Sequence, residues 1–549
     1  MIGADLLVRE LQARGVPFVS VLCGNGLGPF LKAAAEAELP LIDTRNEQAA
    51  SYIADAYARL TRRVGVCAVS SGVAHVNAFA GLLNASYDGA PVLLITGASS
   101  SATLGRGAFQ DLDQVALARP LCKRAELVTK PERIPQAVHE AFAAATSGRP
   151  GPVHLTIPAD VLSGKVDETH IKSPFSTFGE VKNRAAGDAS LVRDATKMLA
   201  DAERPVIVAG SGIFYAEGGD ALRKFIKLSR IPVVTPRWDR GVVNRSTEEF
   251  LGVIGAASGE PKLLEDADLI LLAGARVDYR VRYLDSPPLS EGVRVIRIDF
   301  DPEELNQGFE PDVAIQGSAQ TVFQQLEEEW RSNCYNSHES WLSEARKSHA
   351  DFYSHWAKPA PSAEERLTKL MTGADIVNAI KTVITDETIF LIDGGNIGQW
   401  AHMTLCSDRY PGNWLTCGAS GVVGWGVPGA MAARLAFPDK PVLLLSGDGA
   451  IGFGIPEFES AARQNIPFVT VLADDQAWGI VVSGQRKSRG PMVASKFSPV
   501  QFAKVAEGFG ARGVRVERPE EIVPAIREGF DSLKPTLIHV PIAVGGPAD

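Results

Sequence analysis

Two acidic positions near the C-terminus each follow an apolar segment that is typical of a buried strand. Residues 441–479 read PVLLLSGDGAIGFGIPEFESAARQNIPFVTVLADDQAWG. The first apolar run stops at Gly447-Asp448-Gly449, and the second stops at Asp474-Asp475. Because the carboxyl ends of neighbouring parallel strands open into one crevice, we expect Asp448 and Asp475 to lie close together.

The glycines around Asp448 predict a phosphate site. A glycine-rich turn that opens a helix presents backbone N–H groups to a phosphate. Carboxylates beside a phosphate repel it unless a cation lies between them, and oxygen ligands suit Mg²⁺. The segment therefore predicts a diphosphate held through Mg²⁺, with Asp448 and Asp475 among the metal ligands.

Two other interpretations fit this segment taken alone. Gly447-x-Gly449-x-x-Gly452, with an acid at the end of the next strand, also matches the dinucleotide-binding pattern. Against that interpretation, Asp448 lies inside the glycine turn, where the pyrophosphate of a dinucleotide approaches without a metal. The remaining alternative is an ordinary βαβ turn with solvated acids.

A second acid, Glu47, lies at a predicted helix start. In LIDTRNEQAASYIADAYARL (41–60) a short strand precedes Glu47, and small and apolar residues then recur at helical spacing. The helix dipole alone favours an acid at this position. The position is also the carboxyl edge of a parallel sheet, where such folds place ligands. Both interpretations remain open on these residues.

Continuous apolar strands divide the chain into three α/β segments. Strands that are apolar throughout are typical of parallel sheets covered on both faces. We therefore expect an α/β protein with three doubly wound parallel-sheet domains at 1–165, 189–330 and 367–549. A polar linker (163–188) and a connecting stretch with some helix (332–366) separate them. The expected strands are 66–71, 91–97, 153–158, 205–210, 231–236, 269–274, 295–301, 388–393, 441–446, 467–473 and 536–541.

Composition narrows the function classes. The 549 residues carry a net charge of −10 and hold no Lys/Arg-rich block, so we expect no nucleic-acid partner. The six cysteines are scattered without a C-x-x-C pair, which indicates reduced thiols in the cytoplasm. The N-terminus lacks the features of a signal peptide. Apolar runs stay well short of ~18 residues, so we expect no membrane span.

Two distant sets of motifs together resemble thiamine-diphosphate-dependent enzymes. They are Glu47 in RNEQAA, Ser70-Ser71-Gly72 followed by Asn77, Phe109-Gln110-Asp111 before Asp113, and GDG paired with DDQAWG. The groups most similar are acetolactate synthase, benzaldehyde lyase, oxalyl-CoA decarboxylase and 2-hydroxyacyl-CoA lyase. The resemblance covers essentially the whole chain. It implies three domains of this enzyme type, the first binding the pyrimidine and the third binding the diphosphate and Mg²⁺.

The resemblance also implies roles for single residues. Glu47 would hydrogen-bond the pyrimidine ring nitrogen, and Gln110 would reach the reacting carbonyl. The Gly421 carbonyl would accept from the pyrimidine amino group, and Val423 would be the apolar wedge that bends the cofactor. The metal ligands would be Asp448, Asp475 and the Ala477 carbonyl. Further cofactor contacts would come from Ser70, Asn77, Asn396, Gly447, Gly449 and Ala450.

The chain departs from the family pattern at four places. Val423 stands where Met, Leu or Ile is usual. Asp474-Asp475 replaces an Asn-Asn pair, so the metal site gains a negative charge. Asn46 replaces the His that usually precedes the catalytic Glu. The loop Cys23-Gly24-Asn25-Gly26 lacks the His seen in benzaldehyde lyase.

The implied activity is C–C bond lyase or carboligase chemistry, or 2-oxo acid decarboxylation, dependent on thiamine diphosphate and Mg²⁺. The substrates would be small molecules: 2-oxo acids, aldehydes or 2-hydroxy ketones, reacting through an enamine intermediate. A CoA-dependent lyase or decarboxylase is the alternative, disfavoured because only AVGGPAD follows Ile542 and no C-terminal lid is visible. A dinucleotide-dependent oxidoreductase and a non-catalytic subunit are more distant; Glu47 together with Asp448 argues against the latter.

Two further expectations follow from the resemblance. The protein would be a homodimer or homotetramer, in which Glu47 of one subunit meets the cofactor held by Asp448 of another. The central segment would carry FAD or ADP, or be only structural. The positions that resemble a nucleotide site there are Gly210-Ser211-Gly212, Arg276, Asp278, Arg280 and Asp299.

Overall fold

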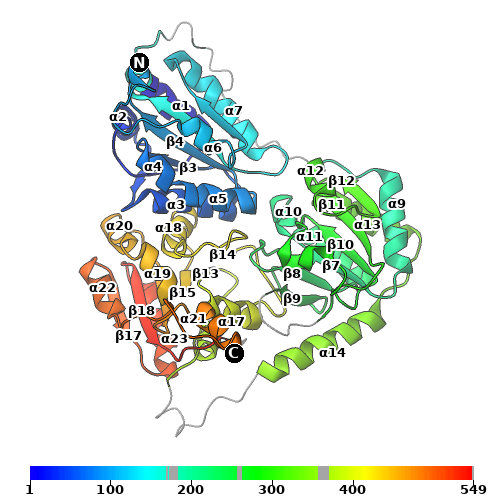
Figure 1. The fold of residues 1–549 in the computed structure, drawn as a ribbon. Coiled ribbons are helices and arrows are strands. Elements are labelled where there is room, and N and C mark those ends of the chain that lie inside the picture. Colours follow the sequence, from blue (N-terminus) through cyan, green and yellow to red (C-terminus); the bar gives the residue numbers. More distant parts are fainter. Residues whose placement is uncertain (168–170, 172–183, 256–261, 357–369, 547–549) are drawn as a thin grey trace.

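Three six-stranded parallel sheets, each flanked by helices, form the described part of the chain (Figure 1). The computed structural model describes residues 1–167, 171, 184–255, 262–356 and 370–546. Most of the expected linker at 163–188 lies outside these residues. In the expected connecting stretch, helix α14 spans Glu339–Trp356, and the part from 357 lies outside the described residues. The doubly wound α/β architecture expected from the sequence is confirmed.

The first domain is built on the strand order β2-β1-β3-β4-β6-β5. Its strands are β1 (Val19–Val21), β2 (Leu41–Asp43), β3 (Gly65–Val69), β4 (Val92–Ala98), β5 (Arg124–Leu127) and β6 (Val153–Pro158). Its helices are α1 (Gly3–Ala13), α2 (Gly28–Glu36), α3 (Glu47–Thr61), α4 (Val73–Asn77), α5 (Phe79–Asp88), α6 (Gln114–Ala118), α7 (Ile134–Thr146) and α8 (Ala159–Ser163).

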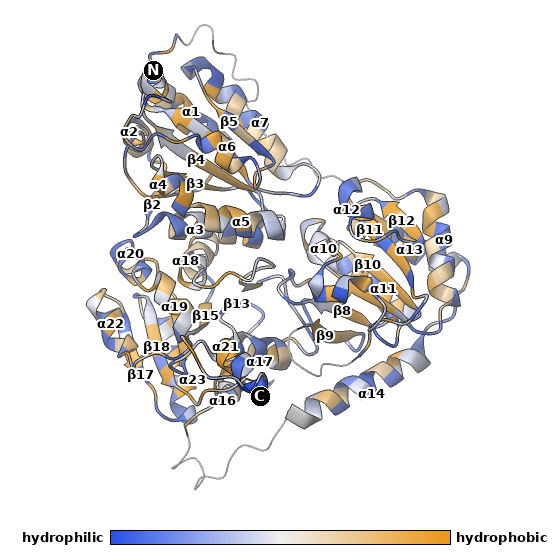
Figure 2. Cartoon of the chain, in the orientation of Figure 1, coloured by the Kyte–Doolittle hydropathy of each residue, from blue (hydrophilic) through white to orange (hydrophobic). Residues whose placement is uncertain are grey.

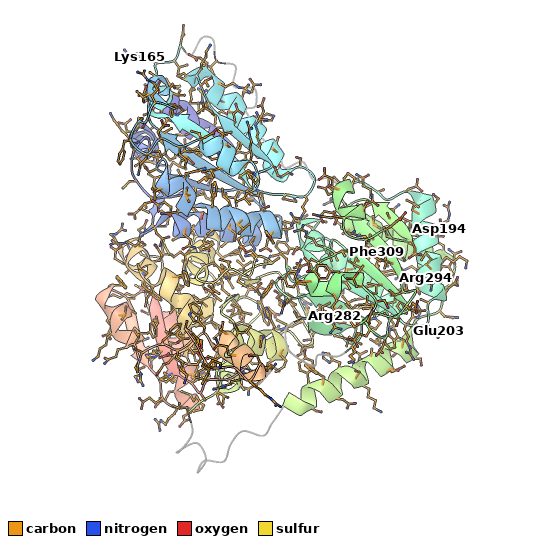
Figure 3. All side chains as sticks on the ribbon, viewed as in Figure 1. Lys165, Asp194, Glu203, Arg282, Arg294 and Phe309 are labelled. Atoms are coloured by element: carbon orange, nitrogen blue, oxygen red, sulfur yellow. The ribbon has the colours of Figure 1, made fainter. Side chains whose placement is uncertain are left out.

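The central domain has the order β12-β11-β10-β7-β8-β9. Its strands are β7 (Pro205–Ala209), β8 (Val233–Pro236), β9 (Phe250–Ile254), β10 (Leu269–Ala273), β11 (Arg294–Asp299) and β12 (Val313–Gln316). Its helices are α9 (Ala189–Asp201), α10 (Ser211–Tyr215), α11 (Gly219–Ser229), α12 (Pro302–Asn306) and α13 (Ala319–Ser332). Figure 3 shows Asp194, Glu203 and Arg294 along the outer side of this domain, on the side away from the first and third domains.

The third domain repeats the topology of the first, with the order β14-β13-β15-β16-β18-β17. Its strands are β13 (Ile389–Asp393), β14 (Trp414–Thr416), β15 (Val442–Gly447), β16 (Val469–Asp474), β17 (Arg512–Arg515) and β18 (Thr536–Pro541). Its helices are α16 (Gly373–Lys381), α17 (Asn396–Leu405), α18 (Gly426–Ala436), α19 (Asp448–Gly454), α20 (Glu457–Arg463), α21 (Gly479–Lys487), α22 (Phe502–Gly508) and α23 (Pro519–Asp531).

The central strands of each sheet are buried on both faces, which explains their continuous apolar sequences. Strand β4 is buried at every residue, and so are β7, β10 and β16. Figure 2 shows the corresponding apolar sheets beneath helices whose outer faces are hydrophilic. Each strand expected from the sequence is present with ends that differ by no more than two residues. No helix in the described part of the chain is long and apolar enough to cross a membrane.

The first and third domains pack directly against each other through α3 and α18 (Figure 1). Tyr52 and Ile53 of α3 share one apolar cluster with Ala430 and Met431 of α18. At the same boundary, Asp43 at the end of β2 bonds Arg463 and Gln464 of the third domain. These contacts place the loop before α3 beside the third domain.

Candidate active site

Asp448 and Asp475 meet at the carboxyl edge of the third sheet. Strands β15 and β16 pair in parallel, with Gly447 opposite Ala473, so both chains leave the sheet at the same level. Asp448 begins α19, and its Oδ2 accepts the backbone N–H of Ala477 at 3.1 Å. The two acids are only 6% and 8% exposed. Burial, and for Asp448 also the neighbouring charge of Asp475, raises the pKa of both carboxyls.

The neighbouring acid, Asp474, is hydrogen-bonded to His539 and to the backbone of Gln476. Its Oδ2 lies 2.7 Å from His539 Nε2, and its Oδ1 accepts the Gln476 N–H at 3.1 Å. Both acids of the pair lie close enough to Asp448 for their charges to raise its pKa, and Asp475 is the stronger neighbour.

Glycines make room for the cluster. A Cβ at Gly479 would lie 2.3 Å from Asp475 Oδ2 and 2.8 Å from Asn396 Nδ2, and a Cβ at Gly449 would lie 2.6 Å from the Trp478 ring. Asn396 begins α17 at the end of the neighbouring strand β13 and is 8% exposed. Asn396, Asp448 and Asp475 thus converge on one small polar site from three adjacent strand ends.

This site fits a magnesium ion bound together with a diphosphate. Mg²⁺ is usually held by one or two carboxylates, with phosphate oxygens and water completing its octahedron. Asp448 and Asp475 supply two carboxylates, and Ala477 lies in the same turn. The described residues contain no group of three His, Cys, Asp or Glu side chains arranged for a metal. Two carboxylates with backbone and ligand oxygens are therefore the available donor set.

A buried acid, Asp393, holds the loop that carries Gly421 and Val423. Its carboxylate accepts the N–H groups of Gly424 at 3.1 Å and Gly426 at 2.8 Å. Gly421 and Gly424 have φ of +68° and +87°, which glycine adopts without strain. Burial raises the pKa of Asp393 to about 7. Sequence reasoning missed Asp393, because its strand-end position carries no signal of its buried partners.

The first domain holds the same loop from the other side. Asp88 Oδ1 accepts the Ala419 N–H at 2.8 Å, and the Ser420 hydroxyl donates to Asn84 Oδ1 at 2.6 Å. Asp88 itself is paired with buried Arg59 at 2.8 Å. The loop at 417–426 is therefore anchored by side chains of both domains.

Glu47 is the first residue of α3, as the sequence predicts. Asn46 caps this helix, since its Oδ1 accepts the Ala49 N–H at 2.8 Å. Glu47 Oε2 accepts from Asn77 Nδ2 at 3.0 Å, so these two site residues are brought together. Asn77 is exposed and Glu47 is half-buried.

Ser70 and Gln110 form a second polar group in the first domain. Gln110 Oε1 accepts from the Ser71 hydroxyl at 3.1 Å and lies 3.4 Å from the Ser70 hydroxyl. Gln110 has φ of +57°, an uncommon value, and a Cβ at Gly72 would lie 2.8 Å from the Gln110 Cβ. The Gly72 N–H in turn donates to Gln114 Oε1 at 2.9 Å. Gln114, like Asp393, was not foreseen from the sequence.

Within one chain, Glu47 lies away from the Gly421–Val423 loop. The α3 residue that is linked to this loop is Asp55, which accepts from Asn84 at 2.8 Å, and Asn84 in turn accepts from Ser420 of the loop at 2.6 Å. Asp55 is eight residues further along α3 than Glu47, or about 12 Å at 1.5 Å per residue. Exposed apolar side chains of the first domain lie on α4 and beside Gln110: Val73 (65%), Val76 (49%) and Phe109 (73%). In the third domain, Phe453 and Ile480 are both 47% exposed.

The glycine turn of the central domain uses its donors within the protein. The N–H groups of Gly210 and Gly212 donate to Ala273 O and Gly274 O, both at 2.9 Å. The Ser211 N–H donates to Asp239 Oδ2 at 3.1 Å. A phosphate at this turn would have to displace those bonds, so the turn does not fit a nucleotide phosphate as it stands.

The other central positions are likewise paired. Arg280 is 4% exposed and binds Asp278 and Asp239. Arg276 lies 3.6 Å from Glu304, and Asp299 accepts the Asp301 N–H at 2.9 Å. Each side chain therefore has an internal role in the fold.

Comparison with known proteins agrees with this architecture. Three domain models of thiamine pyrophosphate enzymes match in order: the N-terminal TPP binding domain at 1–117, the central domain at 192–326, and the C-terminal TPP binding domain at 393–540.

Relatives match over nearly the whole chain. A probable acetolactate synthase large subunit of Methanocaldococcus jannaschii is 30% identical, over 99% of this chain and 92% of the relative. The acetolactate synthase isozyme 2 large subunit of Escherichia coli is 29% identical, over 99% and 96%. Human 2-hydroxyacyl-CoA lyase 2 is 30% identical, over 94% and 86%. With its three matched domains and a full-length relative at this identity, the chain belongs to the thiamine-diphosphate enzyme family.

Proposed function

We propose that this thiamine-diphosphate enzyme is a Mg²⁺-dependent carboligase or lyase of the acetolactate synthase type, acting on 2-oxo acids, aldehydes or 2-hydroxy ketones. The observation that carries the proposal is the convergence of Asp448, Asp475 and Asn396 at three adjacent strand ends. Glycine turns at Gly449 and Gly479 leave space beside them. The family match gives this polar site its ligand class.

The side chains divide the work in the proposed site. Asp448, Asp475 and the Ala477 carbonyl would hold Mg²⁺, while Asn396 and the backbone of Gly447, Gly449 and Ala450 would hold the diphosphate. The Gly421 carbonyl and Val423 would fix the bent shape of the cofactor. When bound, thiamine diphosphate supplies a carbon nucleophile that adds to the substrate carbonyl.

The first domain would supply the proton chemistry. Glu47 would share a proton with the pyrimidine ring nitrogen, and Asn77 orients the Glu47 carboxylate by its hydrogen bond. Gln110, held by Ser71 and near Ser70, would donate to the substrate carbonyl. A carboxylate that moves a proton in this way contributes on the order of 10²–10⁴ in rate.

We propose that a complete site needs two copies of the chain. The separation of Glu47 from the Gly421–Val423 loop along α3 supports this proposal, because a second copy would bring its own loop to Glu47. The exposed apolar residues Val73, Val76 and Phe109 would then be covered. The assembly would be a homodimer or a homotetramer.

A substrate screen tests the proposed function. Purified protein with thiamine diphosphate and Mg²⁺ is incubated separately with pyruvate, glyoxylate, benzoin, formaldehyde and a 2-hydroxyacyl-CoA, and products are identified by mass. New C–C bonds from pyruvate or glyoxylate support the acetolactate-synthase-like activity. Cleavage of the C–C bond of the 2-hydroxyacyl-CoA alone, to an aldehyde and formyl-CoA, supports the second candidate, a 2-hydroxyacyl-CoA lyase, favoured by the 30% identity to human 2-hydroxyacyl-CoA lyase 2. Turnover that persists without thiamine diphosphate contradicts both.

A nucleotide cofactor in the central domain and the cellular location of the protein are two further predictions. FAD or ADP in the central domain is tested by denaturing the purified protein and measuring released flavin absorbance and nucleotide mass. A cytoplasmic location is supported by the six cysteines, which all carry free thiols. It is tested by fractionating cells that express the tagged protein.

A further inference from the structure

A fully buried acid of the third domain binds the backbone just before Glu47. Glu457 begins α20 and is 0% exposed. Its Oε1 and Oε2 accept the same N–H, that of Arg45, at 2.9 Å and 3.2 Å. Arg45 lies in the turn between β2 and α3, two residues before Glu47. The acid of one domain thus holds the turn that carries the catalytic acid of another.

Other groups around α20 hold the same turn at Asp43. Gln464, directly after α20, accepts the Asp43 N–H at 3.0 Å and donates to the Asp43 carbonyl at 2.8 Å. Arg463 pairs with the Asp43 carboxylate at 2.7 Å. These groups fix the start of the turn, and Glu457 fixes the part next to Glu47.

Burying the Glu457 carboxylate costs folding free energy unless its oxygens accept hydrogen bonds. A buried carboxylate must be satisfied by donors, because an apolar surrounding disfavours its charge. Glu457 is the first residue of α20, and an exposed acid at that position would need no partner beyond the helix dipole. Here its carboxylate is instead directed across the domain interface, to a backbone N–H of the first domain.

We propose that Glu457 is a positioning residue for Glu47. The inference rests on the proposed function, in which Glu47 shares a proton with the cofactor. With Glu457 in place, the Arg45 N–H is fixed, and α3 starts at one defined place with Glu47 as its first residue. Without Glu457, the turn keeps its Asp43 contacts and the bond of the Thr44 hydroxyl to the Asn46 carbonyl, but it loses the carboxylate that holds the Arg45 N–H. A displacement of about 1 Å in a reacting group lowers a rate by roughly 10²-fold.

The test compares Glu457→Ala and Glu457→Gln with a matched control, Glu459→Ala. Glu459 lies on the same helix, and it contacts the guanidinium groups of Arg45 at 3.4 Å and Arg463 at 2.9 Å rather than the backbone. Three quantities are measured: hydrogen exchange of the 41–50 backbone in cofactor-free protein, affinity for thiamine diphosphate, and the exchange rate of the thiazolium C2 proton in the bound cofactor. Cofactor affinity reports on binding, whereas the C2 proton exchange rate reports on the alignment of Glu47 with the bound cofactor.

For Glu457→Ala we expect faster amide exchange in the turn, cofactor affinity within about threefold of the original, and C2 proton exchange slowed by about 10- to 100-fold. Glu457→Gln retains one acceptor oxygen for the Arg45 N–H, so its effect should be intermediate. Glu459→Ala should leave cofactor affinity and C2 proton exchange unchanged, because it leaves the bond of Glu457 to the Arg45 N–H in place. This graded pattern would support the positioning role.

A Glu47→Gln variant keeps the two levels of inference apart. If Glu47→Gln slows C2 exchange and Glu457→Ala does not, the positioning role is wrong while the proposed function stands. If Glu47→Gln leaves C2 exchange unchanged, the proposed function itself fails. If Glu457→Ala does not fold, Glu457→Gln decides. Slowed exchange of the C2 proton with a normal melting temperature supports the positioning role. Unchanged C2 proton exchange together with unchanged amide exchange overturns it.

Discussion

Replacing each of the paired acids by asparagine tests how the metal would be held. Asp448→Asn and Asp475→Asn each remove one charge from a site where both carboxylates are more than nine-tenths buried. Asp475 stands where the family usually has Asn, so the site should tolerate Asp475→Asn. Asp448 accepts the Ala477 N–H at 3.1 Å in addition to its proposed role as a metal ligand. Asp448→Asn should therefore lose both the ligand charge and the geometry of that turn.

The expected size follows from Coulomb's law. Two like charges about 4–5 Å apart repel by roughly 3–4 kcal/mol at an effective dielectric constant near 20. Asp475→Asn removes that repulsion together with an attraction to Mg²⁺ of similar size, so the two changes largely cancel. We expect its cofactor affinity to change by no more than about tenfold, ~1.4 kcal/mol. Asp448→Asn should weaken affinity by more than about 100-fold, ~2.7 kcal/mol.

Titration of thiamine diphosphate into Mg²⁺-loaded variants measures these affinities. Trp478, whose ring packs beside Gly449, provides an intrinsic fluorescence signal at the site. Asp474→Asn is the matched control, because its side chain is bound to His539 and should have little effect on metal affinity. Equal damage from Asp475→Asn and Asp448→Asn would refute the assignment of Asp475 to the asparagine-type ligand position. A large loss in Asp474→Asn alone would mean that the wrong acid of the pair was chosen.

Three other outcomes are expected. Glu47→Gln should lower kcat by about 10²–10⁴ with a native melting curve, since Gln keeps the shape but cannot share the proton; a kcat near that of the original protein argues against Glu47 as the catalytic acid. Burial raises the pKa of Asp393 to about 7 against an ordinary ~3.9, so the folded state binds the extra proton between these pH values. Stability of cofactor-free protein should therefore fall as pH rises from about 4 to about 7, and Asp393→Asn should flatten that dependence in melting temperatures; an unchanged slope contradicts the assignment. Sedimentation should show at least a dimer, and a fully active monomer would exclude a shared site.

The strand-end acids were predictable from sequence because of a geometric rule. Parallel strands finish at one edge of their sheet, so Asp448 and Asp475 had to emerge together once 441–446 and 467–473 were identified as strands. The same rule placed Glu47 at the start of α3. The strands that went unrecognised were short or at sheet edges. Edge strands β5 (RAEL) and β17 (RGVR) carry charged residues that hide the apolar pattern.

Tertiary structure decided which polar groups act together. In sequence, Asp393, Asp88 and Glu457 look like ordinary surface acids, yet each is buried and binds backbone N–H groups of a loop that carries site residues. Glu457 and Arg45 are 412 residues apart, so no local pattern reveals their contact. Such partners are set by how α20 packs against the β2–α3 turn.

Packing also determines the different roles of Asp474 and Asp475, and whether the central glycine turn can bind a phosphate. The sequence places two carboxylates at the end of β16, but the position of His539 on β18 determines that Asp474 is bound to a histidine, while Asp475 is the stronger charged neighbour of Asp448. The Gly210–Gly212 pattern matched a nucleotide turn, but the strand beside it takes up the N–H groups of both glycines. A pattern states which donors and acceptors are present, whereas packing determines which of them remain available to a ligand.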